Sequence, residues 1–542
     1  MLLLLTACTL ITDHAIDVKV GVSGADSVPF DTSTNGDTGY HTGDDTGAPG
    51  DTGSGVIDGD GDGYTVGEGD CDDSNPEVHP GGTEICGDGL DDDCDGSADQ
   101  CELTSRSLSA ADAEFDGQAA DDEAGYALSG AGDVNGDGLA DILVGAYGNG
   151  SRKGATYLVF GSSLPVSGAL ASANAVFVGI SAGDESGASV AGVGDVDGDG
   201  YDDMLVGAPG TAENAGAAYF LRGSAAPPSC TLASAGAVFT GETGDDAGYF
   251  VASAGDVNGD STPDLLVGAL RPGTTSAGSA YVIFGGGEPA SAPLSSADAV
   301  FSGEHSNDGV GSALASAGDV DGDGFDDVVV GAYGAGSDMA GAAYILLGGS
   351  SVLSGSLNLA DAVYAGAPED EAGRGVSSAG DYNGDGYADV IIGAYNNGDA
   401  ASAAGAVFLV LGGPRPLSEP LTDADAEWTG VDANDEAGTA VSSAGDVDGD
   451  GFDDVLVGAP HNGDGGDAAG AAYLILGSAT PASGSLAHAQ AEFRGPEAGD
   501  FAGAAVAGAG DTNGDGAPDL LVGAFGVRSS AGSAYLILGM GL

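Results

Sequence analysis

Carboxylates recur along this chain in a loop whose spacing is typical of metal binding. The pattern D-x-[DN]-G-D-x-x-x-D, called the acidic loop below, begins seven times at intervals of 61 to 65 residues. Hard cations such as Ca²⁺ take six to eight oxygen ligands, commonly from alternating loop positions and a backbone carbonyl. We therefore expect side-chain ligands at loop positions 1, 3, 5 and 9, and a carbonyl ligand at position 7.

The seven loops predict about seven Ca²⁺ ions, because a metal-free turn rich in Asp, Asn and Gly would not need the full ligand set each time. Position 3 alternates between Asn and Asp, so we expect the second, fourth and sixth loops to bind more tightly. Ser261 replaces a glycine of the other loops, which predicts a weaker third site. The expected ligands are Asp133, Asn135, Asp137, Leu139, Asp141; Asp195, Asp197, Asp199, Tyr201, Asp203; Asp256, Asn258, Asp260, Thr262, Asp264; Asp319, Asp321, Asp323, Phe325, Asp327; Asp381, Asn383, Asp385, Tyr387, Asp389; Asp446, Asp448, Asp450, Phe452, Asp454; and Asp511, Asn513, Asp515, Ala517, Asp519.

A second acidic region, residues 58–101, is rich in cysteine and predicts one or two further Ca²⁺ ions. Two disulfides in an oxidising compartment explain the four cysteines, and four cysteines allow three connectivities. A cysteine zinc cluster is the alternative, and His79 is interpreted as a loop residue. The expected ligands are Asp58, Asp60, Asp62, Tyr64 and Asp70 (or Glu68) in one loop and Asp91, Asp93, Asp95, Ser97 and Asp99 in the other; the cysteines are Cys71, Cys86, Cys94 and Cys101.

Four strand-like pieces surround each acidic loop. In the first repeat they are residues 111–117, 125–132, 141–146 and 154–161, and short apolar runs bounded by Gly and Asp are typical of buried strands. Four strands per repeat, repeated radially, predict an all-β, seven-bladed propeller with four-stranded antiparallel blades and small residues innermost. The last repeat has no fourth strand of its own. Residues 111–117 should therefore complete the seventh blade and close the ring.

The repeats resemble the FG-GAP family found in integrin α-subunits. The family's GAP element appears as Gly145-Ala-Tyr147, Gly207-Ala-Pro209, Gly268-Ala-Leu270, Gly331-Ala-Tyr333, Gly393-Ala-Tyr395, Gly458-Ala-Pro460 and Gly523-Ala-Phe525, while the FG element keeps only its glycine. This resemblance implies Ca²⁺ between the first two strands of each blade. Residues 70–96 resemble the MopE-type metal-binding motif and, more loosely, thrombospondin type 3 repeats. The MopE label mentions copper, but hard oxygen ligands favour Ca²⁺.

The expected domain order is a signal segment (1–8), a Gly/Asp/Thr-rich linker (9–57), the Cys/Asp module (58–101) and the propeller (106–542). Leu5-Thr-Ala-Cys8 resembles a bacterial lipobox, which implies export and lipidation of Cys8 in an outer-membrane, cell-surface or extracellular protein. A basic region and a full-length apolar run are missing, so an upstream start or a chance match are the alternatives.

The charge and the motifs favour a binding role. With 10 basic and 85 acidic residues, the net charge of −75 excludes nucleic acid and anionic membrane as partners. No nucleophile elbow, zincin motif or P-loop is present. We predict a monomeric adhesion or ligand-binding module for an extracellular protein or glycan; a structural surface protein and a hydrolase with a carboxylate pair are the alternatives. The ligand should bind opposite the acidic loops, on a face where the loops between blades carry acidic clusters. The candidate contacts are Tyr147, Tyr333, Tyr395 and Phe525; the alternative is that these aromatic rings only cap the core of the blades.

Overall fold

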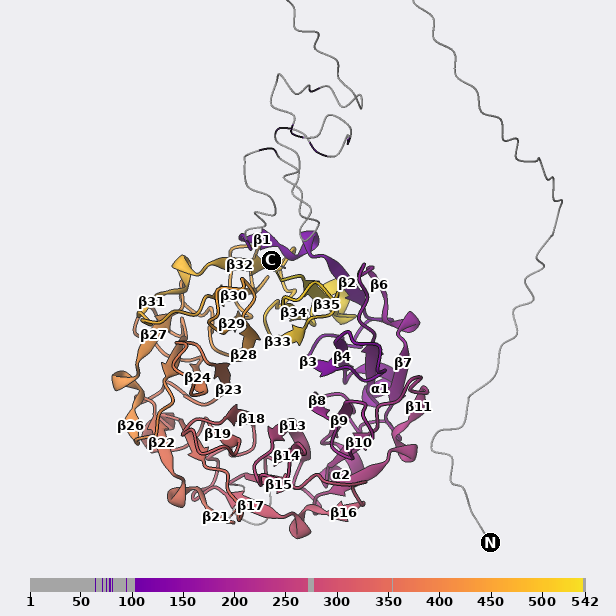
Figure 1. Ribbon diagram of the computed structural model, residues 1–542, viewed down its shortest axis with the longest axis vertical. Helices are drawn as coiled ribbons and strands as arrows, with labels where there is room; N and C mark the ends of the chain where they lie inside the picture. Colours follow the sequence, from indigo (N-terminus) through magenta and orange to yellow (C-terminus); the bar gives the residue numbers. More distant parts are fainter. Residues whose placement is uncertain are drawn as a thin grey trace, which may run out of the picture. The chain divides into compact units, whose positions relative to one another are not determined.

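Seven β-sheets surround a common axis (Figure 1). The computed structural model describes residues 103–271, 277–352 and 354–539, together with Tyr64, Cys71, Asn75, Val78, Pro80 and Cys94. We number the sheets as blades 1 to 7 in the chain order of their innermost strands. The predicted all-β, seven-bladed propeller is confirmed.

The first strand of each blade lies at the axis in Figure 1 and the second lies beside it. The first strands are β3 (Ala127–Gly132), β8 (Ser189–Gly194), β13 (Ala247–Gly255), β18 (Ala313–Gly318), β23 (Gly375–Gly380), β28 (Ala440–Gly445) and β33 (Ala505–Gly510). The second strands are β4 (Asp141–Ala146), β9 (Asp203–Ala208), β14 (Asp264–Ala269), β19 (Asp327–Ala332), β24 (Asp389–Ala394), β29 (Asp454–Ala459) and β34 (Asp519–Ala524).

The third and fourth strands complete an antiparallel meander. The third strands are β5 (Ala155–Val159), β10 (Ala217–Leu221), β15 (Ser279–Ile283), β20 (Ala342–Leu346), β25 (Ala406–Val410), β30 (Ala471–Ile475) and β35 (Ser533–Ile537). The fourth strands, in blade order, are β7 (Ala175–Val178), β12 (Ala237–Thr240), β17 (Ala299–Ser302), β22 (Ala362–Ala365), β27 (Ala426–Thr429), β32 (Ala491–Arg494) and β2 (Ala113–Asp116).

Each blade also has a fifth strand of two residues, which the sequence analysis did not predict. It pairs in parallel with the fourth strand and comes from the segment that precedes the next fourth strand. A short 3₁₀ turn with a buried leucine, such as Leu170, lies between this short strand and the fourth strand that follows it in the chain. In blade order these strands are β11 (Cys230–Thr231), β16 (Ala292–Pro293), β21 (Gly355–Ser356), β26 (Glu419–Pro420), β31 (Gly484–Ser485), β1 (Arg106–Ser107) and β6 (Gly168–Ala169).

Short helical turns account for the described helices. The 3₁₀ turns before the fourth strands are η2 (Leu108–Ala110), η3 (Leu170–Ser172), η4 (Leu232–Ser234), η5 (Leu294–Ser296), η7 (Leu357–Leu359), η8 (Leu421–Asp423) and η9 (Leu486–His488). The loops between second and third strands contain α1 (Asn149–Arg152), α2 (Thr211–Asn214), η6 (Ser337–Met339) and α3 (Val527–Ser530). Several residues of these four loop turns have positive φ, so they are tight loops rather than regular helices.

Close contact between blades explains the small residues of the inner strands. A Cβ atom on Gly192 of β8 would lie 2.5 Å from the Gly130 carbonyl oxygen of β3 in the neighbouring blade. The second strands are buried along their whole length, and the apolar clusters combine side chains of adjacent blades, such as Leu143 of blade 1 with Met204 of blade 2. The core is therefore a series of layers between blades.

The ring is closed by β2, the fourth strand that comes earliest in the chain, as predicted for residues 111–117. The strand β2 pairs antiparallel with β35, so that Ala113 faces Leu536 and Asp116 faces Ser533. In Figure 1 the indigo β2 lies beside the yellow β35. Blade 7 thus combines the two ends of the propeller sequence, and β35 has no open edge.

Candidate metal centres

Each acidic loop joins the first strand of a blade to the second. In blade 1 the loop follows β3, and its ninth residue, Asp141, is the first residue of β4. The side chain of Asp133, at position 1, accepts N–H groups of Gly136 and Asp137 at 2.7 and 3.0 Å and of Gly138 at 2.8 Å. These bonds curl the backbone around the first carboxylate. Gly138 supports the turn with a φ of +91°.

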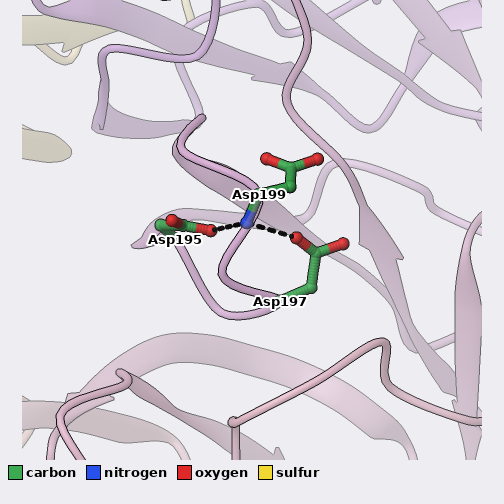
Figure 2. A group of neighbouring side chains, drawn as sticks. All are labelled: Asp195, Asp197 and Asp199. Atoms are coloured by element: carbon green, nitrogen blue, oxygen red, sulfur yellow. Dashed lines mark hydrogen bonds between the residues drawn. The ribbon is translucent and has the colours of Figure 1, made fainter.

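The same turn in blade 2 brings three carboxylates together. Figure 2 shows the N–H of Asp199 donating to Asp195 at 2.9 Å and to Asp197 at 3.2 Å. The N–H of Tyr201, at position 7, donates to Asp199 at 3.1 Å, so the position 7 backbone adjoins position 5. One oxygen from each aspartate lies within 4.8 Å of the other two.

The ninth loop residue is an aspartate that is fully buried in every blade. In blade 2, Asp203 accepts the N–H of Val196 at 3.0 Å and that of Gly223 at 2.9 Å. Burial raises the pKa of this carboxyl to about 7 in blades 1 to 6 and to about 6 in blade 7. The seven residues are Asp141, Asp203, Asp264, Asp327, Asp389, Asp454 and Asp519.

This donor set fits a hard cation. In blade 5 the Oδ2 atom of Asp389 is buried without a hydrogen-bond partner, which leaves an oxygen for an ion. Groups of three acidic side chains with oxygens within 4.8 Å occur in blades 2, 4 and 6, where position 3 is Asp. In blade 1, position 3 is Asn135, whose amide donates to Asp141 at 3.3 Å. An amide also offers an oxygen ligand. The expected ligand positions therefore adjoin one another. The groups of three carboxylates occur in the even-numbered blades, where the sequence predicts an additional carboxylate at position 3.

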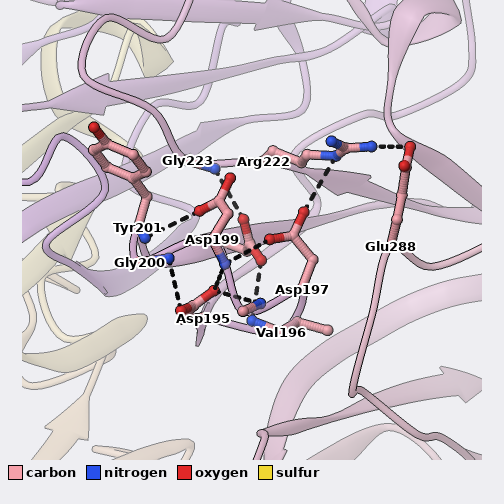
Figure 3. A network of polar contacts seen from close by, with 11 residues as sticks. Asp195, Val196, Asp197, Asp199, Gly200, Tyr201, Arg222, Gly223 and Glu288 are labelled. Carbon is pink, nitrogen blue, oxygen red and sulfur yellow. Dashed lines mark hydrogen bonds and ion pairs between the residues drawn. The ribbon is translucent and has the colours of Figure 1, made fainter.

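One arginine that the sequence analysis missed lies at the loop of blade 2. The Nε atom of Arg222 is 3.4 Å from Oδ2 of Asp197, and the same guanidinium pairs with Glu288 (Figure 3). Asp197 has only 5% of its side chain exposed. Arg222 follows the third strand, far from the loop in sequence, so the loop pattern carried no signal of it. The positive charge of Arg222 offsets the charge of the fourth carboxylate, which distinguishes the blade 2 site from the sites of the odd-numbered blades.

Blade 3 keeps the loop geometry despite its serine. Ser261 has a φ of +70°, and its N–H donates to Asp256 at 2.7 Å, as a glycine does in the other loops. A side chain in the left-handed region is strained. The substitution therefore costs backbone energy while the hydrogen bond is retained.

The Cys/Asp module is described at only a few residues. Cys71 and Cys94 form a disulfide with a Cα–Cα distance of 5.6 Å. Tyr64 is also described, whereas the other predicted ligands of this module, and Cys86, Cys101 and Cys8, lie outside the described residues. This bond is compatible with only one of the three possible connectivities of the four clustered cysteines.

The face opposite the acidic loops contains a cavity of about 580 Å³. All seven blades contribute lining residues, mostly from the starts of the first strands, so the cavity lies at the axis. Tyr147 and Phe525, two predicted contacts, line it, whereas Tyr333 and Tyr395 are not among its lining residues. We call it the axial cavity.

Aromatic rings missed by the sequence analysis form one wall of the axial cavity. The ring centroid of Tyr126 is 4.5 Å from that of Tyr147 and 5.8 Å from that of Phe525. Phe525 stacks on Phe501 at 5.1 Å, and His461 follows at 5.5 Å from Phe501. Tyr126 directly follows an FG-type glycine, but a single aromatic there is a weak signal.

Arginines and carboxylates surround these rings. Arg152 lies 5.1 Å from the Tyr147 ring centroid and pairs with Glu185 at 3.0 Å. Arg374 lies 5.8 Å from the ring of Tyr333. The hydroxyl of Tyr395 donates to Glu371 at 2.5 Å. Tyr333 and Tyr395 are therefore engaged with neighbouring side chains of the propeller.

A buried aspartate precedes the first strand of every blade. In blade 1, Asp122 is 4% exposed and accepts the N–H of Ala119 at 2.9 Å. The acidic clusters between blades therefore contain one carboxylate that holds a turn and does not face a ligand. The seven residues are Asp122, Asp184, Asp245, Asp308, Asp370, Asp435 and Asp500.

These features define the class of protein as a seven-bladed β-propeller with an acidic loop between the first two strands of each blade. Comparison with known families narrows the class: the chain carries six FG-GAP repeats, at residues 124–159, 186–221, 247–283, 310–346, 372–410 and 437–475. Each repeat covers the first three strands of one of blades 1 to 6. The Cu-binding MopE family, described as a metal-binding motif, matches residues 70–100.

Two integrin α-chains are similar to part of the chain. Integrin alpha-5 of Xenopus laevis is 32% identical over 160 residues, which are 28% of this chain and 15% of that protein. Integrin alpha-PS2 of Drosophila melanogaster is 30% identical over 215 residues, which are 38% of this chain and 15% of that protein. The similarity thus spans only a small part of either relative. Among the described residues, no helix has the length and apolarity needed to cross a membrane.

Proposed function

We propose that this chain is a Ca²⁺-binding, non-catalytic module that recognises an extracellular protein or glycan at its axial cavity. The observation that carries the proposal is the position of this cavity. Its wall of Tyr126, Phe525 and Phe501 lies opposite the acidic loops, so ligand contacts and metal contacts are separated. Aromatic rings beside charged groups combine apolar contact with polar recognition. The similarity to integrin α-chains supports a role in adhesion.

The ion of the acidic loops is Ca²⁺, with about one ion per loop. Each loop offers carboxylate or amide oxygens at positions 1, 3, 5 and 9, and hard oxygen donors suit Ca²⁺ better than softer metals. The bound ion would neutralise carboxylates such as Asp195, Asp197 and Asp199, which lie together in blade 2. Its role is therefore to stabilise the loop between the first two strands of a blade rather than to take part in a reaction.

Binding at the axial cavity can be tested with glycan and protein arrays probed with the Ca²⁺-loaded protein. The Tyr126→Ala variant removes a ring that is 39% exposed and should weaken binding about tenfold or more, since buried aromatic contacts dominate many interfaces. Leu164→Ala removes an apolar side chain that is 78% exposed and lies outside the lining of the axial cavity. Equal binding by both variants and the wild type would rule out the axial cavity as the ligand site.

The site of action is outside the cytoplasm, with a lipid on Cys8 as the anchor. The Cys71–Cys94 disulfide supports an oxidising compartment, since disulfides are rare in the cytosol. Cell fractionation of the wild type and Cys8→Ser tests the anchor. The wild type should follow the membrane fraction and the variant should not; the same fractionation pattern for both would contradict lipidation.

A further inference from the structure

One position of the repeat lines the axial cavity in all seven blades. It directly follows the glycine of the FG element, and this glycine is constant whereas the residue after it changes from blade to blade. Blades 1, 3 and 5 have a long side chain with a polar end at this position, and the other blades have a short one. The long residues are Tyr126, Tyr249 and Arg374, and the short ones are Ala188, Ser312, Thr439 and Ala504. Three long and four short side chains leave room at the axis, so this position sets the size and the polarity of the cavity.

Arg374 is the member of this set that carries a charge. Six of the eight arginines in the chain pair with a carboxylate, whereas within the described residues Arg374 and the exposed Arg415 have no such partner. Arg374 is half-buried, and its guanidinium lies over the ring of Tyr333, 5.8 Å from the ring centroid. The ring holds the guanidinium in place without neutralising it. A half-buried cation of this kind favours an anion beside it.

The surroundings of Arg374 lack a carboxylate because of a glycine in blade 4. Two positions before the FG glycine, blades 1, 2, 3, 5 and 6 have an acidic residue, whereas blade 4 has Gly309. A Cβ atom on Gly309 would lie 2.5 Å from Cε1 of Tyr333, so the ring beneath Arg374 occupies the space of the missing side chain. In blade 5 itself, the acidic residue Glu371 accepts the hydroxyl of Tyr395 at 2.5 Å. Blade 4 thus omits the carboxylate at the point where Arg374 lies.

The carboxylates that line the axial cavity already have partners. Glu185 pairs with Arg152 at 3.0 Å, and Glu436 lies 2.9 Å from His461. Arg374 therefore remains as an uncompensated positive charge in the wall of the cavity. Because the net charge of the whole chain is −75, its surface repels a polyanion, while the cavity attracts a single negative group. These charges favour a ligand with one negative group on an otherwise neutral body.

The rest of the cavity fits a sugar ring. The ring of Tyr126 is 39% exposed and lies 4.5 Å from that of Tyr147, which offers an apolar wall to the C–H groups of a sugar. Within the described part of the chain, the hydroxyls of Tyr126 and Tyr249 have no hydrogen-bond partner, so they can bond to sugar hydroxyls. Partial burial raises the pKa of Tyr126, Tyr249 adds to the rise and Arg374 opposes it, so the three side chains act on one another across the cavity. The volume of about 580 Å³ is typical of pockets for small molecules, whereas a protein partner would need a broader interface.

We propose that the axial cavity binds the end of a glycan whose terminal sugar carries one carboxylate. The sugar ring lies against Tyr126, and the carboxylate pairs with Arg374, whose guanidinium can donate two parallel hydrogen bonds to it. An acidic peptide shares the carboxylate but offers no sugar ring to the aromatic wall. This inference rests on the proposed ligand-binding function and names the chemical class of the ligand.

The test measures the affinity of the Ca²⁺-loaded, full-length protein for two matched pairs of glycans. One pair is sialyllactose and lactose, and the other is a disaccharide that ends in glucuronic acid and its counterpart that ends in glucose. In at least one pair the acidic member should bind about tenfold or more tightly than the neutral one, and the two pairs distinguish a sialic acid from a uronic acid.

Variants of Arg374 assign this preference to its charge. Arg374→Gln should lower the affinity for the preferred acidic glycan about tenfold or more and leave the affinity for the neutral glycan unchanged. Arg374→Lys keeps the charge and should retain most of the preference. Arg415→Gln changes the net charge equally, at an exposed arginine outside the lining of the axial cavity, and should bind as the wild type does.

Two outcomes overturn the inference and leave the proposed function standing. One is a ligand found on the glycan or protein arrays whose binding Tyr126→Ala weakens, while the wild type prefers the acidic member of neither pair. The other is an unchanged affinity for the acidic glycan in Arg374→Gln. The comparison of glycan pairs on the wild type still decides if circular dichroism shows that Arg374→Gln does not fold. Ligand binding that stays at the wild-type level in Tyr126→Ala overturns the proposed function, and the acidic-sugar site with it.

Discussion

Arg222 lies against Asp197, with its Nε atom 3.4 Å from the carboxylate of an acidic loop. The pair makes blade 2 different from blades 4 and 6, where position 3 is also aspartate. A positive charge beside a cation site weakens binding of the cation. Among the three sites with four carboxylates, the blade 2 site should therefore bind Ca²⁺ less tightly than the sites of blades 4 and 6.

The first prediction is that Arg222→Leu tightens the blade 2 site. Leucine occupies the corresponding position in blade 4, as Leu347. Unit charges about 4 Å apart in water interact by ~1 kcal/mol, so the gain should be roughly fivefold in affinity. Ca²⁺ titration against a competing chelator measures it. Arg271→Leu changes the net charge equally at a pair with Asp246, away from the acidic loops, and serves as the control; an equal gain there would point to bulk charge.

The second prediction concerns the serine of blade 3. Ser261→Gly should stabilise the protein by about 1 kcal/mol, because glycine adopts the positive φ of this position without strain. Urea unfolding in Ca²⁺ measures the change. The reverse substitution Gly324→Ser at the matching position of blade 4, where φ is +92°, should destabilise by a similar amount. Unchanged stability in both variants would contradict the strain argument.

The third prediction is that stabilisation by Ca²⁺ grows with pH. Burial raises the pKa of Asp203 and Asp327 from 3.8 to about 7, so the metal-free folded state binds more protons than the unfolded state between these values. The contribution of these carboxyls to the stability of the metal-free protein is therefore greatest in acid and is lost as the pH rises through about 7. Bound Ca²⁺ favours the ionised carboxylates.

Melting temperatures with Ca²⁺ and with a chelator should consequently differ more at about pH 8 than at about pH 5. Replacing Ca²⁺ by Na⁺ at equal ionic strength controls for screening of the acidic surface. An equal Ca²⁺ effect at the two pH values would show that the buried aspartates do not control metal binding.

The fourth prediction is that Arg528 holds the closing strand. Its guanidinium pairs with Glu114 and Asp116 of β2, while Ser533 donates to both carboxylates. Arg528→Met should destabilise by about 1 kcal/mol, since the arginine is half exposed. Hydrogen exchange should rise in β2 first. Arg415→Met, at an exposed site on another blade, is the control; equal exchange in β2 for both variants would contradict this role.

The fifth prediction is a second disulfide between Cys86 and Cys101. The Cys71–Cys94 bond leaves these two as the remaining cysteines of the clustered four. Mass spectrometry of unreduced peptides from the exported protein should find the linkage. Two free thiols at these positions would contradict it, and binding of zinc by them would favour the metal interpretation of the cysteines.

The fold could be predicted from the sequence because the repeat of 61 to 65 residues is visible in its loops, its strands and its turns. The acidic loop, the buried second strand and the glycines recur together, and the missing fourth strand of the last repeat indicated ring closure. The fifth strands escaped detection because two residues, such as Gly168–Ala169, carry no pattern. Their pairing depends on the neighbouring repeat.

The candidate site was less accessible to sequence reasoning where it joins residues from different strands. The loop ligands lie within nine residues, so their spacing is informative. Arg222 reaches Asp197 from the end of the third strand. No local pattern connects such pairs. Likewise, Tyr126 and Phe501 come together only because blades 1 and 7 are neighbours in the closed ring.

The closure of blade 7 by β2 has a consequence for the order in which the protein can mature. Because the chain is made from its N-terminus, β2 emerges long before its antiparallel partner β35, which is made only with the last repeat. The same holds for β1, whose partner β32 belongs to the sixth blade. If the chain crosses a membrane in an unfolded state, β1 and β2 lack these partners while the intermediate blades fold. A prematurely terminated chain would therefore leave the β35 side of β2 unpaired and accessible to proteases, so that closure of the ring distinguishes complete chains from incomplete ones.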